Sequence, residues 1–234
     1  MAIKLLLKIF FAVPVWFLQC VFFKKRIFIN NQILDLQTQA LLSLQSLQVN
    51  PLANPKAFSS TNDLRKALEG GREGLPLSKK PSCQIKIIDH LLQTKFGHLK
   101  LREYYPEGCS MQSPILYLHG GGYVVGSINT HDPWLKFFSA EISAKIFSLE
   151  YRLAPENKFP SSLLDANLAL EWLGERLQMP IEEISICGDS AGGHLAASLS
   201  THRAIHNLEL PHSQCLIYPM TDPSCNSKSQ LDFA

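Results

Sequence analysis

A Gly-x-Ser-x-Gly pattern at residues 188–192 is the feature that most constrains what this 234-residue chain can fold into. The apolar segment 184–187 ends directly before the pattern, and small residues follow it. Glycines two positions before and after a serine let a strand and a helix approach closely at a sharp, strained turn. The pattern therefore predicts that Ser190 lies between a strand and a helix, with its hydroxyl above the edge of a sheet.

This position favours Ser190 as a nucleophile. The N-terminus of the helix behind it favours negative charge that develops during a reaction. Gly188, Asp189 and Gly192 complete the motif and support the turn. The alternative is a tight turn whose glycines serve packing alone.

A second glycine-rich segment, residues 119–122, follows the short apolar run 115–118. Ester hydrolysis builds negative charge on the carbonyl oxygen, and each fixed N–H donor stabilises that oxyanion by about 3 kcal/mol at the transition state. We expect the donors to be the N–H groups of Gly121, Gly122 and Ala191. A flexible loop is one alternative, and a phosphate-binding loop is another, although the lysine and hydroxyl residues of that motif do not follow.

His119 and Gly120 begin this glycine-rich segment. A histidine at the start of the loop suits a structural role in which it orients the glycines. We therefore predict that His119 supports the loop, and we keep the role of catalytic base as the minor alternative.

Strands and helices alternate from about residue 82 onward. Short apolar runs bounded by turn residues indicate strands, and longer amphipathic segments indicate helices. This order predicts an α/β sandwich with a mostly parallel sheet. The expected strands are 83–89, 97–105, 115–118, 146–151, 184–187 and 215–218, and the expected helices are 131–144, 161–177 and one that Ser190 opens.

The segment 151–156, Tyr-Arg-Leu-Ala-Pro-Glu, follows one of the expected strands. Arg152 and Glu156 carry opposite charges at its two ends. We expect their ion pair to fix the turn, and substrate binding is the minor alternative.

The first 30 residues contain an apolar run, 9–23, that is interrupted by Gln19 alone and has basic residues on both sides. Its length is marginal for a spanning helix, which needs about 20 mostly apolar residues. We predict a membrane anchor or interfacial helix over residues 4–26, and otherwise a cytoplasmic protein. An uncleaved export signal and an apolar helix packed on the fold are the alternatives.

Residues 31–80 show helical spacing of apolar residues and no strand alternation. In the second half of this segment, Thr61 or Asn62 is expected to cap a helix through Leu68 that the following glycine pair ends. Two helices before any strand favour a helical cap over a part of the sheet. The expected organisation is therefore a hydrophobic segment (1–30), a helical cap (31–80) and an incomplete α/β core (81–234).

The charge balance and the cysteines exclude several classes of function. A net charge of +2 and a pI of about 8.2 are too balanced for a nucleic-acid surface. None of the six cysteines forms a Cys-x-x-Cys pair or a cluster with zinc-ligand spacing, so we predict no metal site. Cys187 and Cys215 lie in apolar runs and are expected to be buried small hydrophobic residues.

The three segments 119–122, 151–156 and 188–193 together resemble the hormone-sensitive-lipase-like family of α/β-hydrolases. The similarity covers about residues 34–219, and the helical segment 34–68 resembles the family's N-terminal cap. The resemblance implies hydrolysis of small-molecule carboxylic esters through an acyl-enzyme, without a metal or cofactor. The leading apolar segment resembles that of membrane-anchored arylacetamide-deacetylase-like members.

The triad of this fold follows the order serine, acid, histidine. Each strand–helix–strand step takes at least about 30 residues, and only the polar segment 220–234, which contains no histidine, follows Pro219. Asp222 follows the wrong strand, and we interpret it as a turn residue. The later histidines are not expected to reach the Ser190 hydroxyl from the correct side; these are His194, His202, His206 and His212.

We therefore expect a truncated product or a fragment of a longer chain. It would lack the catalytic acid and histidine as well as the last strands, and it would expose a sheet edge. A non-catalytic ligand-binding protein on the same scaffold, as in the plant gibberellin receptors that resemble this family, is the main alternative. Acyl transfer to an acceptor other than water is a weaker one.

Overall fold

The computed structural model describes residues 13–22, 26–29, 32–45, 59–72, 80–108, 114–222, 224, 226–228 and 231. The chain divides into two compact units. The larger unit comprises residues 68–73 and 79–221, and the smaller one comprises 1–67, 74–78 and 222–234. The predicted organisation into segments 1–30, 31–80 and 81–234 stays a prediction.

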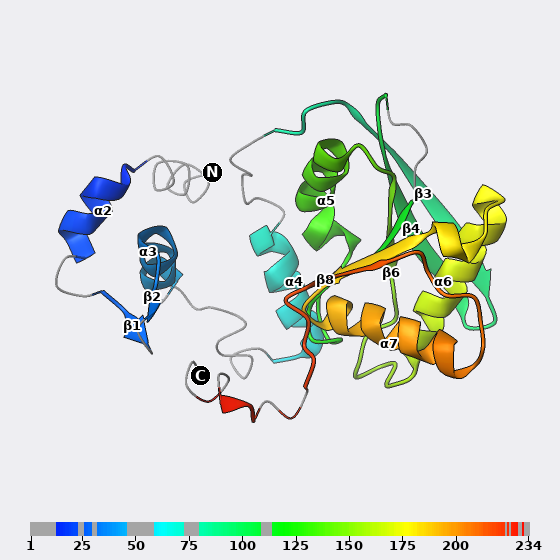
Figure 1. Cartoon of the computed structure of the whole chain (residues 1–234). Coiled ribbons are helices and arrows are strands. Elements are labelled where there is room, and N and C mark those ends of the chain that lie inside the picture. Colours follow the sequence, from blue (N-terminus) through cyan, green and yellow to red (C-terminus); the bar gives the residue numbers. More distant parts are fainter. Residues whose placement is uncertain are drawn as a thin grey trace. The chain divides into compact units, whose positions relative to one another are not determined.

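The larger unit is built on a six-stranded sheet with the order β3-β4-β6-β5-β7-β8 (Figure 1). The pairs β3–β4 and β4–β6 are antiparallel, and β6, β5, β7 and β8 run parallel to one another. The predicted α/β sandwich with a mostly parallel sheet is confirmed. The strands are β3 (Ile85–Thr94), β4 (Gly97–Pro106), β5 (Ile115–Leu118), β6 (Ile146–Glu150), β7 (Ser185–Asp189) and β8 (Gln214–Ile217).

Helices cover both faces of this sheet. α5 (Ile128–Ile142) lies on one face, and α6 (Ser161–Leu177) and α7 (Ala191–Ile205) lie on the other (Figure 1). A short 3₁₀ helix, η2 (Ile181–Glu183), leads from α6 into β7. Because successive strand residues point to opposite faces, each buried strand contributes to two apolar cores.

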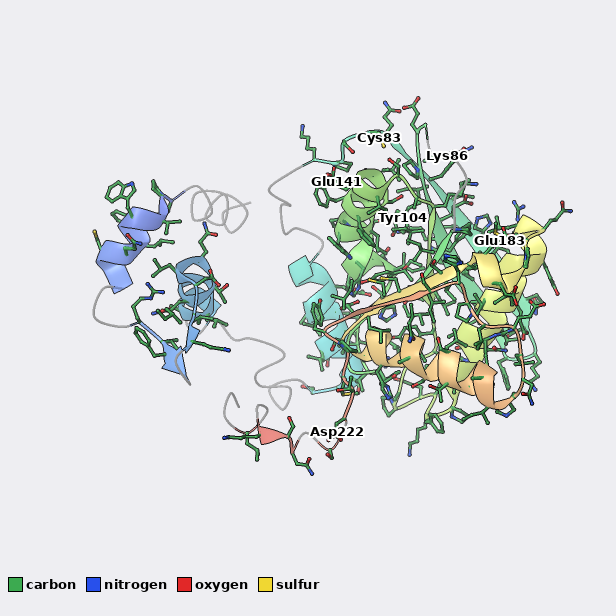
Figure 2. The ribbon with its side chains drawn as sticks, viewed as in Figure 1. Cys83, Lys86, Tyr104, Glu141, Glu183 and Asp222 are labelled. Carbon is green, nitrogen blue, oxygen red and sulfur yellow. The ribbon has the colours of Figure 1, made fainter. Side chains whose placement is uncertain are left out.

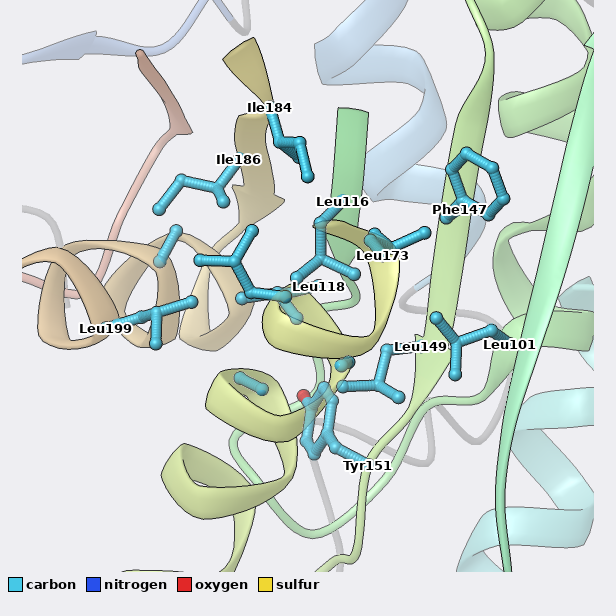
Figure 3. Packing of buried hydrophobic residues seen from close by; sticks show 14 of the residues in the cluster. Leu101, Leu116, Leu118, Phe147, Leu149, Tyr151, Leu173, Ile184, Ile186 and Leu199 are labelled. Carbon is cyan, nitrogen blue, oxygen red and sulfur yellow. The ribbon is translucent and has the colours of Figure 1, made fainter. Parts of the chain in front are cut away.

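The larger core lies between the sheet and the helices α6 and α7. Leu116 and Leu118 of β5 point into it together with Leu173 of α6 (Figure 3). The smaller core faces α5 and contains Tyr104 of β4 (Figure 2) and Tyr117 of β5. Burying one large apolar side chain contributes roughly 1.5–3 kcal/mol, so both faces stabilise the sheet that carries the loops described below.

The β3–β4 hairpin turns where the sequence predicts, between Thr94 and Gly97, which are paired across it. Gly97 has a φ of 114°, a conformation that favours glycine. β3 continues well beyond its predicted end at Asp89, because it stays paired with β4 up to the turn and buries Leu92.

α5 begins a turn earlier than the predicted start at His131. The Ser127 hydroxyl accepts a hydrogen bond from the Thr130 N–H at 3.2 Å, and the Thr130 hydroxyl oxygen accepts one from the Ser127 N–H at 2.9 Å. This reciprocal pair satisfies N–H groups that a helix start leaves without partners. Pro133 consequently lies inside the helix rather than in its first turn.

The smaller unit contains α2 (Val15–Phe22), α3 (Leu36–Gln45) and a hairpin that the sequence did not predict, β1 (Phe28–Ile29) with β2 (Gln32–Ile33). Leu18 of α2 packs against the buried residues of α3. α2 covers part of the predicted apolar segment, whose residues 9–12 and 23 lie outside the described residues. Among the described residues, no helix has the length and apolar character that crossing a membrane requires.

α4 (Thr61–Arg72) differs from its prediction at both ends. The hydroxyl of Ser60 accepts a hydrogen bond from the Asp63 N–H at 3.2 Å, so Ser60, rather than Thr61 or Asn62, caps the helix. The helix also passes through the glycine pair 70–71, which was expected to end it. The assignment of residues 31–80 as a cap stays a prediction.

Candidate active site

Ser190 occupies the junction between β7 and α7. Its backbone angles, φ 53° and ψ −117°, lie in a region that costs a non-glycine residue about 1–3 kcal/mol. The first turn of α7 fixes its backbone, because the His194 N–H donates a hydrogen bond to the Ser190 carbonyl oxygen at 3.0 Å. The predicted strand–serine–helix turn is confirmed, and its Ser190 side chain is half-buried.

Two glycines of the motif are required by close backbone contacts. A Cβ atom on Gly192 would lie 2.6 Å from the carbonyl oxygen of His119, and one on Gly188 would lie 2.7 Å from that of Leu118. Real Cβ atoms essentially never approach other atoms so closely. Glycine at these positions therefore lets the start of α7 pack against the end of β5.

In the glycine-rich loop after β5, Gly120 and Gly121 pack closely against neighbouring atoms, and Gly122 has open space around its Cα atom. Gly121 and Gly122 have φ values of 134° and 60°, and a Cβ atom on Gly122 would meet nothing within 4 Å. Within the described part of the chain, no hydrogen bond engages the N–H groups of Gly121, Gly122 or Ala191. The predicted oxyanion donors are thus three unengaged N–H groups, on this loop and on the residue after Ser190.

Asp189 joins this loop to the serine turn. Its Oδ1 atom accepts hydrogen bonds from the Gly120 N–H and from the Tyr117 hydroxyl, both at 2.8 Å. Nε2 of His131, on α5, lies 3.4 Å from its Oδ2 atom. The buried Asp189 carboxylate, which directly precedes Ser190, therefore fixes Gly120, which directly precedes Gly121.

The environment keeps the Asp189 carboxyl ionised. Burial acts to raise its pKa, but the hydrogen bond and charge of His131, with the Tyr117 and Gly120 donors, outweigh it and lower the pKa to about 2. Burial, followed by the Asp189 charge, raises the pKa of Tyr117 well above its usual range. At neutral pH Tyr117 therefore stays a donor and Asp189 an acceptor.

His119 lies fully buried beneath the loop. Its ring stacks on Tyr151, with centroids 4.2 Å apart and planes 14° apart, and the Tyr151 hydroxyl donates to the His119 carbonyl oxygen at 2.5 Å. Nδ1 of His119 lies 2.9 Å from the Gly120 carbonyl oxygen. These contacts fix both the ring and the backbone carbonyl of His119, the first residue of the glycine-rich loop.

A cavity of about 190 Å³ is lined by Tyr123, by His194 and by residues of α6 and α7, and Ser190 is not among the described residues that line it. Tyr123 follows Gly122 and His194 lies one helical turn after Ser190, and the Tyr123 Oη atom is 2.5 Å from His194 Nδ1. Burial raises the pKa of Tyr123 to about 12, so its hydroxyl is protonated at neutral pH. Leu163 of α6 and Leu195 of α7 are among the apolar residues of the cavity wall.

No hydrogen bond joins the Ser190 hydroxyl to any histidine in the part of the chain that the structure describes. His194 contacts Tyr123 and His131 contacts Asp189. Nδ1 of His206 and of His212 lies within hydrogen-bond distance of a backbone carbonyl oxygen. We therefore assign no described histidine as the base.

Asp222 accepts hydrogen bonds from the Ser224 N–H at 2.9 Å and from the Ser224 hydroxyl at 2.6 Å. A side chain that binds the backbone two residues ahead is typical of a turn. The interpretation of Asp222 as a turn residue is confirmed.

Arg152 does not form the predicted ion pair that fixes its turn. Its guanidinium instead pairs with Asp165 of α6, with Nη2 to Oδ1 at 2.7 Å, and its N–H donates to Oδ2 of the same carboxylate at 2.9 Å. Asp165 is almost fully buried, and the planar guanidinium suits two-point binding to a carboxylate. The prediction of a pair with Glu156 was wrong because the helix brings a better-placed acid to the turn.

Sequence reasoning missed His131 and Tyr117, which belong to the network around Asp189. Tyr117 lies in the apolar strand that precedes the glycine-rich loop, and alternation along that strand places it on the face toward α5. His131 had no local indication of its role, because its partner is 58 residues away in sequence.

Comparison with known families agrees with this architecture. A family model described as the alpha/beta hydrolase fold matches residues 115–233, about half of the chain. The matched residues include the glycine-rich loop, the Ser190 turn and strands β5 to β8. The chain belongs to the α/β-hydrolase family, and the predicted resemblance to its hormone-sensitive-lipase-like members is confirmed by the relatives below.

Two curated relatives illustrate this relationship. The chain is 38% identical to ethyl acetate hydrolase of Pseudomonas putida over 158 residues, 64% of this chain and 49% of that protein. It is 31% identical to hormone-sensitive lipase of Mus musculus over 139 residues, 58% of this chain and 18% of that protein. The chain thus spans about half the length of the first relative and less of the second.

Two solved structures share the fold. An ester-hydrolase from the metagenome of Lake Arreo has a TM-score of 0.72 and 28% identity, and the alignment covers 84% of this chain and 64% of that one. A thermophilic carboxylesterase cloned from a metagenomic library has a TM-score of 0.63 and 35% identity, with 70% and 56% covered.

Proposed function

We propose that this chain carries the nucleophile and the oxyanion-binding elements of a carboxylic-ester hydrolase. The observation that carries the proposal is the coupling of Ser190 to the glycine-rich loop through Asp189 and Gly120. Strained serine backbone beside open N–H groups is the arrangement that acyl transfer requires. The ester-hydrolysing relatives described above support the same reaction class.

In the proposed reaction, Ser190 Oγ attacks the carbonyl carbon of an ester. The N–H groups of Gly121, Gly122 and Ala191 stabilise the resulting oxyanion, the alcohol leaves, and water then releases the acid from the acyl-enzyme. Loss of one such donor costs roughly 10²–10³ in rate, so the loop accounts for much of the catalysis. His119, Gly120, Gly188, Asp189 and Gly192 act as positioning residues.

The substrate class is a small-molecule ester with a compact apolar group. The wall of the cavity beside the serine turn includes Tyr123, which directly follows Gly122, and His194, whose N–H donates to the Ser190 carbonyl oxygen at 3.0 Å. The cavity beside His194 has a volume of about 190 Å³. Because an apolar cavity of about 150 Å³ is large enough to bind benzene, this one has room for a short acyl chain or one small ring.

The test compares the chain with its Ser190→Ala variant in the hydrolysis of p-nitrophenyl butyrate. Ser200→Ala is the matched control, because Ser200 lies on the same helix and hydrogen-bonds Gln214 instead of facing the loop. Because no described histidine is assigned as the base, we expect only slow release of p-nitrophenol, driven by the oxyanion donors, with a butyryl adduct that accumulates on Ser190. Both should be lost in Ser190→Ala and kept in Ser200→Ala. Equal rates and equal adducts in all three proteins would contradict the proposal.

We further propose that the N-terminal segment associates with membrane surfaces. α2 buries Leu18 but leaves Trp16 64% exposed and Phe17 48% exposed, and basic residues follow the helix. Exposed aromatic residues beside positive charge favour the interface of an anionic membrane. Co-sedimentation with vesicles of anionic phospholipid should fall in a Trp16→Ser/Phe17→Ser variant, and unchanged binding would overturn this assignment.

A further inference from the structure

Cys187 and Cys215 are direct partners on neighbouring strands. They occupy the same register position of the parallel pair β7–β8. Residues in register on parallel strands point to the same face of the sheet. Cys187 belongs to the core beneath α5, so the Cys215 thiol lies on that face as well. The sequence predicted both residues to be buried, but Cys215 is exposed, because it lies on the half-exposed strand β8.

The spacing of the two strands is compatible with a covalent link. Neighbouring strands lie about 4.7–4.9 Å apart, and the Cα atoms of disulfide-bonded cysteines are usually about 4.4–6.8 Å apart. The Cβ atoms of in-register residues stay about as far apart as the strands, slightly more than a relaxed disulfide prefers. A bond at this position would be strained, and strained disulfides are the readily reduced ones.

The two thiols differ in reactivity. Burial, followed by the neighbouring Cys215 thiol, raises the pKa of Cys187 well above its usual value, so this thiol stays protonated and does not start an exchange with a reagent from solvent. Cys215 is open to solvent. A small-molecule disulfide therefore reacts with Cys215 first. Cys187 is the in-register neighbour that can then react with the mixed disulfide formed on Cys215.

We propose that Cys187 and Cys215 form a modification site that closes an intramolecular disulfide on reaction with a small-molecule disulfide. The Cys215 thiolate attacks one sulfur of the reagent, forms a mixed disulfide and releases one thiolate. Cys187 then attacks the Cys215 sulfur and releases the second thiolate, which takes up the proton from Cys187. Two protein thiols are oxidised to one disulfide, and one reagent disulfide is reduced to two thiols.

The site lies directly beneath the nucleophile. Cys187 comes three residues before Ser190, and Cys215 comes two residues before Ile217. The Ser190 N–H donates to the Ile217 carbonyl oxygen at 2.9 Å. A covalent link at this point would join the strand that carries Ser190 to the strand that holds its backbone. The inference does not depend on the proposed hydrolase activity, since the link is detected chemically.

The test uses the full chain, reduced and then incubated with oxidised glutathione. Remaining thiols are alkylated, and the digest is mapped by mass spectrometry without reduction. We expect a peptide pair joined through Cys187 and Cys215, the loss of two hydrogen atoms from the intact chain, and full reversal by dithiothreitol. Cys83→Ser, a matched change elsewhere in the same unit, should leave this pair intact.

Two variants assign the roles within the pair. Cys215→Ser should abolish the crosslink and leave Cys187 unmodified, and Cys187→Ala should stop the reaction at a glutathione adduct on Cys215. The proposal is overturned if the wild-type chain accumulates that adduct with Cys187 free, or if Cys215 pairs with another cysteine or another chain. The wild-type map decides the question even where a variant does not fold.

Discussion

Ser190 lies between two neighbours of β7, the strands β5 and β8, and these two strands fix its turn by different kinds of contact. On the β5 side, buried groups fix the serine turn: the Gly192 contact with the backbone of His119, and the Asp189 carboxylate with its donors. On the β8 side, Ser190 exchanges backbone hydrogen bonds with Ile217 at 2.9 Å and Met220 at 3.2 Å. β8 itself is half-buried or exposed throughout, and among the described strands it pairs with β7 alone.

The difference separates two tasks that a nucleophile site must perform. The β5 side holds Gly120, which precedes the proposed oxyanion donors Gly121 and Gly122, through the buried Asp189 carboxylate and therefore with a defined geometry. The β8 side contributes backbone hydrogen bonds from a strand open to solvent. Substitutions of similar chemistry should therefore cost far more on the β5 side than on the β8 side.

The largest effect is expected from Gly192→Ala. The added methyl group would overlap the backbone of His119 and Leu118, neither of which is a flexible side chain. We expect a loss of about 3 kcal/mol or more in the free energy of unfolding, measured by denaturant titration. Gly174→Ala is the control, since its Cβ atom would lie 3.3 Å from the nearest atom in a helix that favours alanine. Its cost should lie within about 1 kcal/mol of zero, and equal costs would contradict the account.

Asp189→Asn should remove a pH dependence of stability. The folded-state pKa of Asp189 is about 2, below the unfolded value near 4, so its contribution is present above that value and is lost as the pH falls toward 2. Between about pH 5 and pH 2 the wild-type chain should lose about 2 kcal/mol of unfolding free energy through this group. Parallel stability curves for wild type and Asp189→Asn over this range would show that the network does not hold the carboxylate ionised.

The same substitution, cysteine to serine, at the paired positions Cys187 and Cys215 compares how well β7 and β8 are packed. Cys187→Ser places a hydroxyl in the apolar core beneath α5 and should cost about 1–3 kcal/mol. Cys215→Ser changes an exposed side chain and should stay within about 0.5 kcal/mol of wild type. Denaturant unfolding under reducing conditions measures both, and similar costs would mean that β8 is as well packed as β7.

Among the changes expected to destabilise the chain, Tyr123→Phe should have the smallest effect. This change removes the hydroxyl within hydrogen-bond distance of His194 and keeps the ring that lines the cavity. We expect a loss of about 1 kcal/mol, the usual net value of one such hydrogen bond. His194→Phe should not add a further loss of that size in the double variant, because both changes remove the same bond. Fully additive losses would show that the two groups do not interact.

Local rules predicted the elements that local interactions determine. The structure places β5 at 115–118 and α6 at 161–177, the ranges that apolar periodicity indicates. The start of α5 was missed because its cap pairs Ser127 with a threonine, whereas the expected pattern has an acid or amide at that position. The partner of Arg152 was missed because Asp165 reaches it through the packing of a helix, not through spacing along the turn.

The sequence by itself determined the strand–serine–helix turn, the glycine-rich loop and the family, because steric limits on glycine and serine backbone act within a few residues. Only the tertiary structure decided what holds these parts together. The Asp189 carboxylate, the His131 ring and the Tyr117 hydroxyl meet because three elements converge at one end of the sheet. The same convergence buries Cys187 and leaves Cys215 exposed, since burial depends on which segments pack above each strand and not on the apolar run in which a residue stands.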